Sequence, residues 1–143
     1  PIGTPFCTAV PNSTTYAART RACGNEIVAI NDVTLIARGL PQNSFGFFIA
    51  STTQGFTQMP GGRVGNLCLG GQIGRYVGPG QIQNSGSNGI LSLSLDLTQI
   101  PQPTGFVTAM AGENWNFQAW YRDIGSGGSA VSNFSNGLSV TFN

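Results

Sequence analysis

The side chains that most enzymes use for acid–base chemistry are missing or scarce in this chain. Its 143 residues include no histidine, and all six basic residues are arginine. Histidine is the usual general acid or base and the commonest metal ligand, and lysine is the usual amine nucleophile. Without histidine, a Ser-His or Cys-His pair cannot form. The composition therefore argues against an enzyme, and we expect no catalytic residues.

Five carboxylates remain as candidates for chemistry: Glu26, Asp32, Asp96, Glu113 and Asp123. A glycosidase needs two carboxylates across a cleft. However, Asp96 lies on the solvent-facing side of an expected strand, and Asp32 and Asp123 lie at strand ends, where turn and capping roles are common. A Ca²⁺ site built from Asp32, Asp96 or Asp123 with loop carbonyls is an alternative, although the chain has no Asp-x-Asp-x-Asp-Gly run. We expect isolated surface carboxylates and no metal or cofactor.

Three cysteines allow three possible disulfides, each of which leaves one thiol over. Cys7–Cys23 is the favoured pair, because it closes a short loop near the N-terminus and would stabilise the fold by roughly 3 kcal/mol. Cys68, flanked by Leu67 and Leu69, would then be a buried free thiol or an intermolecular partner. A disulfide indicates an oxidising, extracellular environment. Three reduced cysteines in a cytosolic protein are the alternative.

One tryptophan stands out from an alternating segment, residues 114–122. Apolar Trp115, Phe117, Ala119 and Tyr121 occupy one face, and Asn116, Gln118, Trp120 and Arg122 occupy the other. On this polar face Trp120 could stack on a sugar ring, pack against a neighbouring subunit, or be covered by a loop of its own chain. The candidate interface or sugar-stacking residues are therefore Trp120, Gln118, Asn116 and Arg122.

Strands must position these side chains, since no segment has a helical period. The clearest strand is 90–97, where leucines alternate with Ser92, Ser94 and Asp96, so that one face is buried and the other is solvated. Further strands are expected at 16–22, 26–30, 33–37, 45–50, 67–69, 73–77, 81–83, 106–110, 114–122 and 138–142, with a weak one near Phe56 and a Gly/Ser loop at 125–132. The pattern of short strands and frequent turns predicts an all-β fold, an antiparallel β-sandwich of the immunoglobulin-like or jelly-roll-like kind with eight to eleven strands and no substantial helix.

The chain divides into an N-terminal segment and one domain. Residues 1–15 contain prolines at positions 1, 5 and 11, which exclude a central strand, so we expect an extended arm. Residues 16–143 form the single β-sandwich domain. Such an arm could add a strand to the open sheet edge of a second copy, because main-chain hydrogen bonds supply affinity there. The chain does not begin with Met, which fits a mature protein whose leader has been removed or an excised domain.

The charge pattern bears on partners. Only 8% of the residues are charged and the formal net charge is +1, so little repulsion keeps copies apart. The arginines are Arg19, Arg21, Arg38, Arg63, Arg75 and Arg122. Only Arg19 and Arg21 are close in sequence, so no basic patch and no nucleic-acid partner are expected. No apolar run is long enough to span a membrane.

Four segments carry a family resemblance. NDVTLIARGLP (31–41), GNLCLGGQIGRYVGPGQIQNSG (65–86), GENWNFQAWYRD (112–123) and SNFSNGLSVTF (132–142) resemble a poorly characterised secreted module of environmental bacteria. That module recurs as the C-terminal part of large extracellular proteins and sometimes stands almost alone. The resemblance implies secretion, a β-sandwich and a cell-surface or matrix context. It carries over no catalytic residues, because none are established for the module.

Two functions follow from these observations. The favoured hypothesis is an extracellular structural protein, a subunit that self-assembles with copies of itself into a filament or surface layer by N-terminal strand donation. The alternative is a carbohydrate-binding or adhesive cell-surface module that takes glycans at Trp120.

Overall fold

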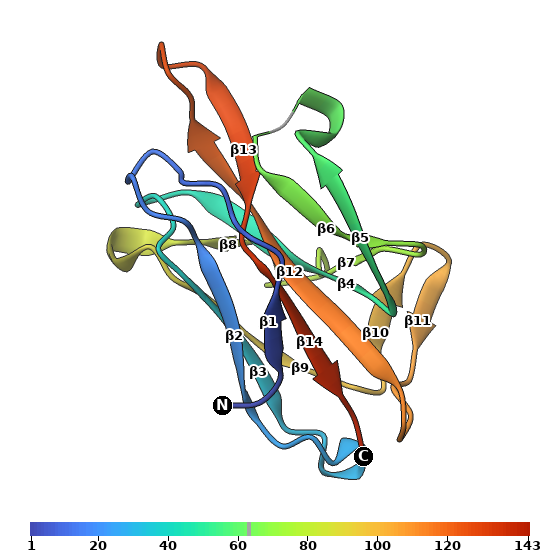
Figure 1. The fold of residues 1–143 in the computed structure, drawn as a ribbon. Coiled ribbons are helices and arrows are strands. Elements are labelled where there is room, and N and C mark those ends of the chain that lie inside the picture. Colours follow the sequence, from blue (N-terminus) through green and yellow to red (C-terminus); the bar gives the residue numbers. More distant parts are fainter. Residues whose placement is uncertain (63) are drawn as a thin grey trace.

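The computed structural model describes residues 1–62 and 64–143, so Arg63 lies outside the described residues. Two antiparallel layers of strands pack face to face (Figure 1). The all-β antiparallel fold predicted from the sequence is confirmed. Among the described residues, no helix has the length and apolar character needed to cross a membrane.

The larger sheet is built around one long strand. Its order is β1 (Thr4–Phe6), β14 (Gly137–Thr141), β12 (Asn114–Ile124), β4 (Phe45–Ser51) and β7 (Gly74–Arg75). In addition, β13 (Ala130–Phe134) pairs with the second half of β12, and β8 (Gln83–Asn84) pairs with the first residues of β4. Figure 1 shows β12, in orange, running diagonally across the molecule between these partners.

The smaller sheet has three strands, β2 (Arg19–Gly24), β3 (Val33–Arg38) and β9 (Leu91–Leu95). Two further hairpins complete the fold, β5 (Thr53–Gln58) with β6 (Asn66–Gly70), and β10 (Ile100–Gln102) with β11 (Gly105–Val107). Short 3₁₀ turns cover Val28–Ile30, Pro60–Gly62 and Gly86–Asn88. Several strands have only two or three residues, which is why more are present than the sequence pattern suggests.

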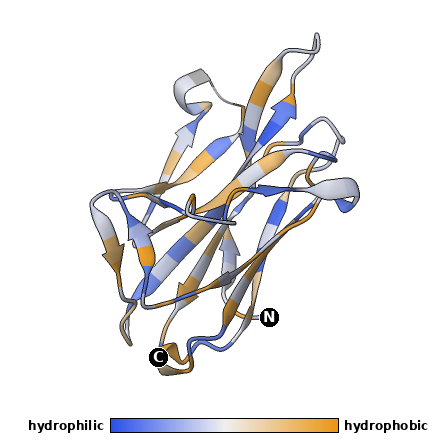
Figure 2. Ribbon diagram, turned by 180° about the vertical axis from the view of Figure 1, so that it is seen from behind, coloured by the Kyte–Doolittle hydropathy of each residue, from blue (hydrophilic) through white to orange (hydrophobic). Residues whose placement is uncertain are grey.

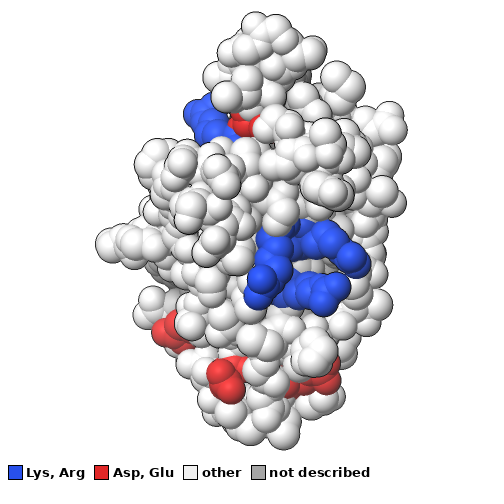
Figure 3. Space-filling view, turned by 90° about the vertical axis from the view of Figure 1, so that its left-hand side faces the viewer, with Lys and Arg blue, Asp and Glu red and all other residues white. Residues whose placement is uncertain are grey.

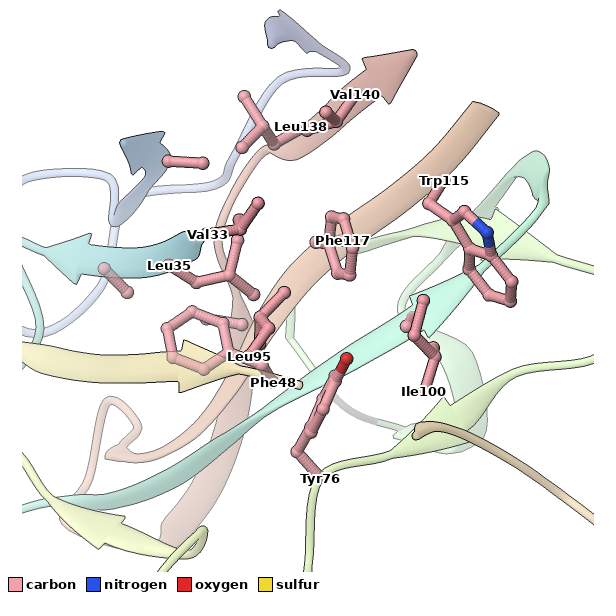
Figure 4. Packing of buried hydrophobic residues seen from close by; sticks show 14 of the residues in the cluster. Val33, Leu35, Phe48, Tyr76, Leu95, Ile100, Trp115, Phe117, Leu138 and Val140 are labelled. Atoms are coloured by element: carbon pink, nitrogen blue, oxygen red, sulfur yellow. The ribbon is translucent and has the colours of Figure 1, made fainter. Parts of the chain in front are cut away.

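The core lies between the two sheets and follows the period-two pattern. Phe48 and Phe117 from the larger sheet meet Val33 and Leu35 from the smaller one, and Trp115 lies farther along the core beside Ile100 (Figure 4). Burial of side chains of this size contributes about 2 kcal/mol each. Seen from behind, the strands change between hydrophobic and hydrophilic residues along their length (Figure 2), as expected when one face of each strand points inward.

The expected strands at 16–22, 73–77, 81–83 and 106–110 are present with shifted or shorter bounds, and two other expected elements differ more. Segment 26–30 is not a strand but contains the 3₁₀ turn, because the side-chain oxygen of Asn25 accepts the N–H of Ile27 (2.9 Å) and Asn31 adopts a left-handed φ of 52°. The expected loop at 125–132 is shorter, since strand β13 begins at Ala130. In both places local turn chemistry and cross-strand pairing outweighed the hydrophobic pattern.

The expected disulfide is wrong. Cys7 pairs with Cys68, and Cys23 is free and exposed. The expectation favoured the shortest loop. In the fold, Cys23 lies on an edge strand of the smaller sheet, whereas the chain after β1 passes over the larger sheet and meets β6. The bridge closes a loop with a sequence separation of 61.

Residues 1–15 lie against the sandwich. β1 pairs with β14, and Ile2 forms a bridge to Ala22 in β2. The buried side chain of Asn12 donates to the hydroxyl of Tyr121 (3.1 Å). In the single chain this segment therefore completes the protein's own sheet edge, and strand donation to a second copy would require β1 to leave β14.

Candidate functional site

The outer face of β12 changes along its length from covered to open. The inner face of the strand is buried in the core. On the outer face, Asn116 and Gln118 are fully buried, Trp120 is half-buried and Arg122 is exposed. The β5–β6 hairpin lies over the first half of this face, and Pro60 of its turn and Leu67 of β6 border the space over Trp120. The open half is the candidate site.

Gln118 fixes the hairpin to the sheet. Its Oε1 accepts the backbone N–H of Cys68 (3.0 Å), and its Nε2 donates to the carbonyl oxygens of Asn66 (2.8 Å) and Ser135 (2.7 Å). Asn116 likewise donates to a backbone carbonyl of β4 (3.1 Å). Because both amides are buried and bonded within the protein, they cannot contact a ligand. The expectation that they belong to the site is corrected: they position it.

Three aromatic residues form a row across the open half. The register places Phe47 of β4 and Phe134 of β13 directly opposite Trp120, one on each side. The Phe47 and Trp120 ring centroids lie 4.9 Å apart with an interplanar angle of 31°. Rings at this spacing stabilise one another beyond their area burial. Cross-strand pairing, rather than the sequence of β12 alone, therefore makes this surface aromatic.

A hollow of about 350 Å³ opens over this row. Here it is called the Trp120 hollow. It is lined by the three aromatic residues, by the apolar side chains Ile49, Pro60, Leu67 and Ile73, and by Arg75 and Arg122. The guanidinium carbon of Arg122 lies 5.1 Å from the centroid of the Trp120 ring, so cation–π attraction holds it at the rim. None of the described lining residues is acidic.

An apolar hollow with a few polar groups at its rim is the usual form of a small-ligand site. No family model, curated protein or solved structure matches this chain. Function resides in a site rather than in a fold, so the chemistry of the hollow is what indicates it. The aromatic floor can contact the C–H face of a ring, and the two guanidinium groups can donate to oxygen atoms. No described lining residue can act as a general acid or base at neutral pH.

The carboxylates are separate from this hollow. Asp96 accepts hydrogen bonds from the hydroxyl (2.6 Å) and N–H (2.9 Å) of Thr98, and these bonds, with one from Asn31, lower its pKa. Asp123 is buried and accepts the N–H of Ser13 (2.9 Å). Within residues 1–62 and 64–143, no three acidic or cysteine side chains gather where they could hold a metal ion.

The sequence pattern identified Trp120 and Arg122 but missed Phe47, Phe134 and Arg75. Period-two alternation in segment 45–50 places Phe47 and Ile49 on one face, which is the one available signal. Arg75 and Phe134 enter only through strand pairing.

Two Asn-x-Ser/Thr sequences match the pattern of N-glycosylation acceptors. They begin at Asn12 and at Asn133, and both asparagines are buried. Burial of both asparagines removes them as exposed glycosylation acceptors.

Proposed function

We propose that this protein is an extracellular glycan-binding module that takes a sugar unit in the Trp120 hollow. The observation that carries this proposal is the aromatic row formed by Phe47, Trp120 and Phe134 beneath an open hollow with Arg75 and Arg122 at its rim. A sugar ring has one relatively apolar face and a border of hydroxyl groups. The aromatic floor suits the apolar face, and the arginines suit the hydroxyl oxygens.

An extracellular location is part of the proposal. The Cys7–Cys68 disulfide supports it, because disulfides persist mainly in oxidising compartments. A rigid site also supports binding without catalysis. The hollow is built on strands rather than long loops, and its covering hairpin is held by a disulfide and by buried amide hydrogen bonds.

The test is a glycan array followed by calorimetry on the glycans that bind. Trp120→Ala should weaken binding at least about tenfold, because it removes the centre of the aromatic floor. Phe106→Ala is the matched control, since Phe106 is a 68% exposed aromatic on β11, in a separate hairpin. Arg75→Gln, a rim change that leaves the aromatic packing intact, should weaken binding without altering the melting temperature. Undiminished binding by both site variants, or no binding by the wild type at millimolar glycan, would overturn the proposal.

A second candidate is the structural subunit of a filament or surface layer. The specific observation is that β1 occupies the edge of the larger sheet through only three residue pairs with β14. Replacement of so short a strand by the same strand of a second copy would propagate head to tail without closing. The Cys7–Cys68 bridge ties the chain beyond β1 to β6 in the same molecule, so exchange would require this bridge to form between chains.

Electron microscopy and non-reducing electrophoresis of the concentrated protein test this second candidate. Filaments that are linked by disulfides and are lost in Cys7→Ser would support it. Discrete monomers at millimolar concentration would exclude it.

A further inference from the structure

Half of the arginines of this chain gather on one face. Arg19 and Arg21 extend from β2 and Arg38 from β3, and the three border a second hollow of about 640 Å³ on the outer side of the smaller sheet. Figure 3 shows them as a blue group around a depression. Here it is called the arginine hollow. The expectation that the arginines form no patch is wrong for these three, because the β2–β3 register places Arg38 opposite Arg19.

The arrangement opposes stability. Residues directly opposite in an antiparallel pair have Cβ atoms about 5 Å apart, and like charges there are destabilising. The described residues that line the hollow include no acidic side chain, and the acidic residues visible on this face lie apart from the group (Figure 3). A chain with a net charge of +1 thus concentrates three positive charges where its own carboxylates do not neutralise them.

The rest of the hollow is suited to a sugar. Half-buried Ile36 lies opposite Arg21 and forms an apolar floor, and Tyr16, 73% exposed, stands at the rim. Beyond Ile36 the register continues to Ser92 of β9. Guanidinium groups bind carboxylate and sulfate oxygens through paired N–H donors. The hollow therefore offers anion contacts at its border and a C–H contact at its base.

We propose that the arginine hollow binds an acidic polysaccharide through its sulfate or carboxylate groups. This site is independent of the Trp120 hollow, since the two lie on the outer faces of different sheets. The compact hollow, with an apolar floor and three guanidinium groups, fits one or two charged sugar units. A nucleic acid would be served better by an extended basic track with several aromatic residues for base stacking.

Binding to defined probes tests the proposal with the full chain. The probes are a heparin hexasaccharide, an oligogalacturonate hexamer, neutral cellohexaose, a 12-nucleotide single-stranded DNA and vesicles with 30% anionic lipid. At least one of the two acidic oligosaccharides should bind, more tightly than any other probe. If only the heparin fragment binds, sulfate is the recognised group. If only oligogalacturonate binds, carboxylate is. If the DNA or the vesicles bound more strongly than both acidic oligosaccharides, the assignment would be overturned.

Variants locate the site. Arg38→Gln should weaken binding about tenfold, since it removes one charge-assisted pair of hydrogen bonds, and the triple change with Arg19→Gln and Arg21→Gln should weaken it about a hundredfold or more. Thr104→Glu on the exposed β10–β11 turn lowers the net charge as much as Arg38→Gln and should leave affinity within about twofold. Equal loss in Thr104→Glu and Arg38→Gln would mean unspecific charge attraction and would overturn the proposal.

Cys23 gives a readout that needs no substitution. It is the free, exposed cysteine at the border of the arginine hollow. A saturating acidic oligosaccharide should slow its alkylation by iodoacetamide several-fold, whereas cellohexaose should not. Binding of the oligosaccharide with no change in the alkylation rate would place the ligand elsewhere and overturn the proposal.

Discussion

The two hollows are built in opposite ways. The Trp120 hollow depends on long-range construction: a hairpin crosses the sheet, a disulfide holds it and buried amides attach it. The arginine hollow takes its charges from strand register, since neighbouring positions of β2 and β3 supply them, and the segment before β2 adds only rim residues such as Tyr16. The first should therefore be sensitive to distant changes that loosen the hairpin. The second should persist as long as the smaller sheet is folded.

The largest effect should come from breaking the disulfide. Cys7→Ser removes a bridge with a sequence separation of 61 and should lower the free energy of unfolding by about 4 kcal/mol, through the loop entropy of the unfolded chain. Urea denaturation measures this change. At urea concentrations too low to unfold the Cys7→Ser variant, glycan binding at the Trp120 hollow should weaken, while anion binding at the arginine hollow stays the same. Cys23→Ser is the control, and an equal loss of stability in that variant would refute the pairing.

Gln118→Ala should have the next largest effect. The change leaves the N–H of Cys68 and the carbonyls of Asn66 and Ser135 without their partner, which costs about 2 to 3 kcal/mol in a buried site. Gln99→Ala, at an exposed position, should remain within about 0.5 kcal/mol. Thermal and urea unfolding measure both. If Gln118→Ala behaved like its control, the hairpin would not be held by this amide.

The sequence predicts each hollow only as far as local patterns determine it. Period-two alternation in segments 90–97 and 114–122 predicts which side chains face the core, and Trp120 was correctly placed on the outer face of β12. Alternation carries no information about what covers that outer face. Gln118 and Trp120 therefore look equivalent in sequence, although one is buried under the hairpin and the other lines a hollow.

The register between strands is the second feature that the sequence did not predict. Arg19 and Arg38 are far apart in sequence and directly opposite in the sheet, because β2 and β3 pair as an antiparallel hairpin. A one-residue shift would send these side chains to opposite faces of the sheet. The disulfide failed for a related reason: loop length favoured Cys7–Cys23, but the path of the chain over the larger sheet decided the partner. The side of the strand on which a residue lies can be read from its neighbours in sequence. The residues that it meets on other strands depend on the topology of the fold.

Alkaline pH should destabilise the fold that supports both hollows. Burial raises the pKa of Tyr121 to about 12 against an ordinary value of 10.0, and burial also raises that of Tyr76. The neutral tyrosine is thus favoured in the folded protein. Its stabilising effect is complete below pH 10 and is lost as the pH rises toward 12, by about 2 kcal/mol for Tyr121. Urea denaturation at pH 9 to 12 should show this decline. In Tyr121→Phe the decline should be smaller; an unchanged slope would contradict the assignment to Tyr121.

The smallest expected effect separates the two hollows most clearly. Replacing an arginine by glutamine should change the free energy of unfolding in opposite directions in the two hollows. Arg38→Gln removes a like-charge pair and should raise the free energy of unfolding by about 0.5 kcal/mol at low salt. Arg122→Gln removes the cation–π contact with Trp120 and should lower it by about 0.5 kcal/mol. Added salt should abolish the gain in Arg38→Gln, since screening already weakens the repulsion in the wild type. It should leave most of the loss in Arg122→Gln, because that contact is short. Two losses of equal size would mean that Arg38 stabilises its sheet, and the arginine hollow would then need no ligand to explain it.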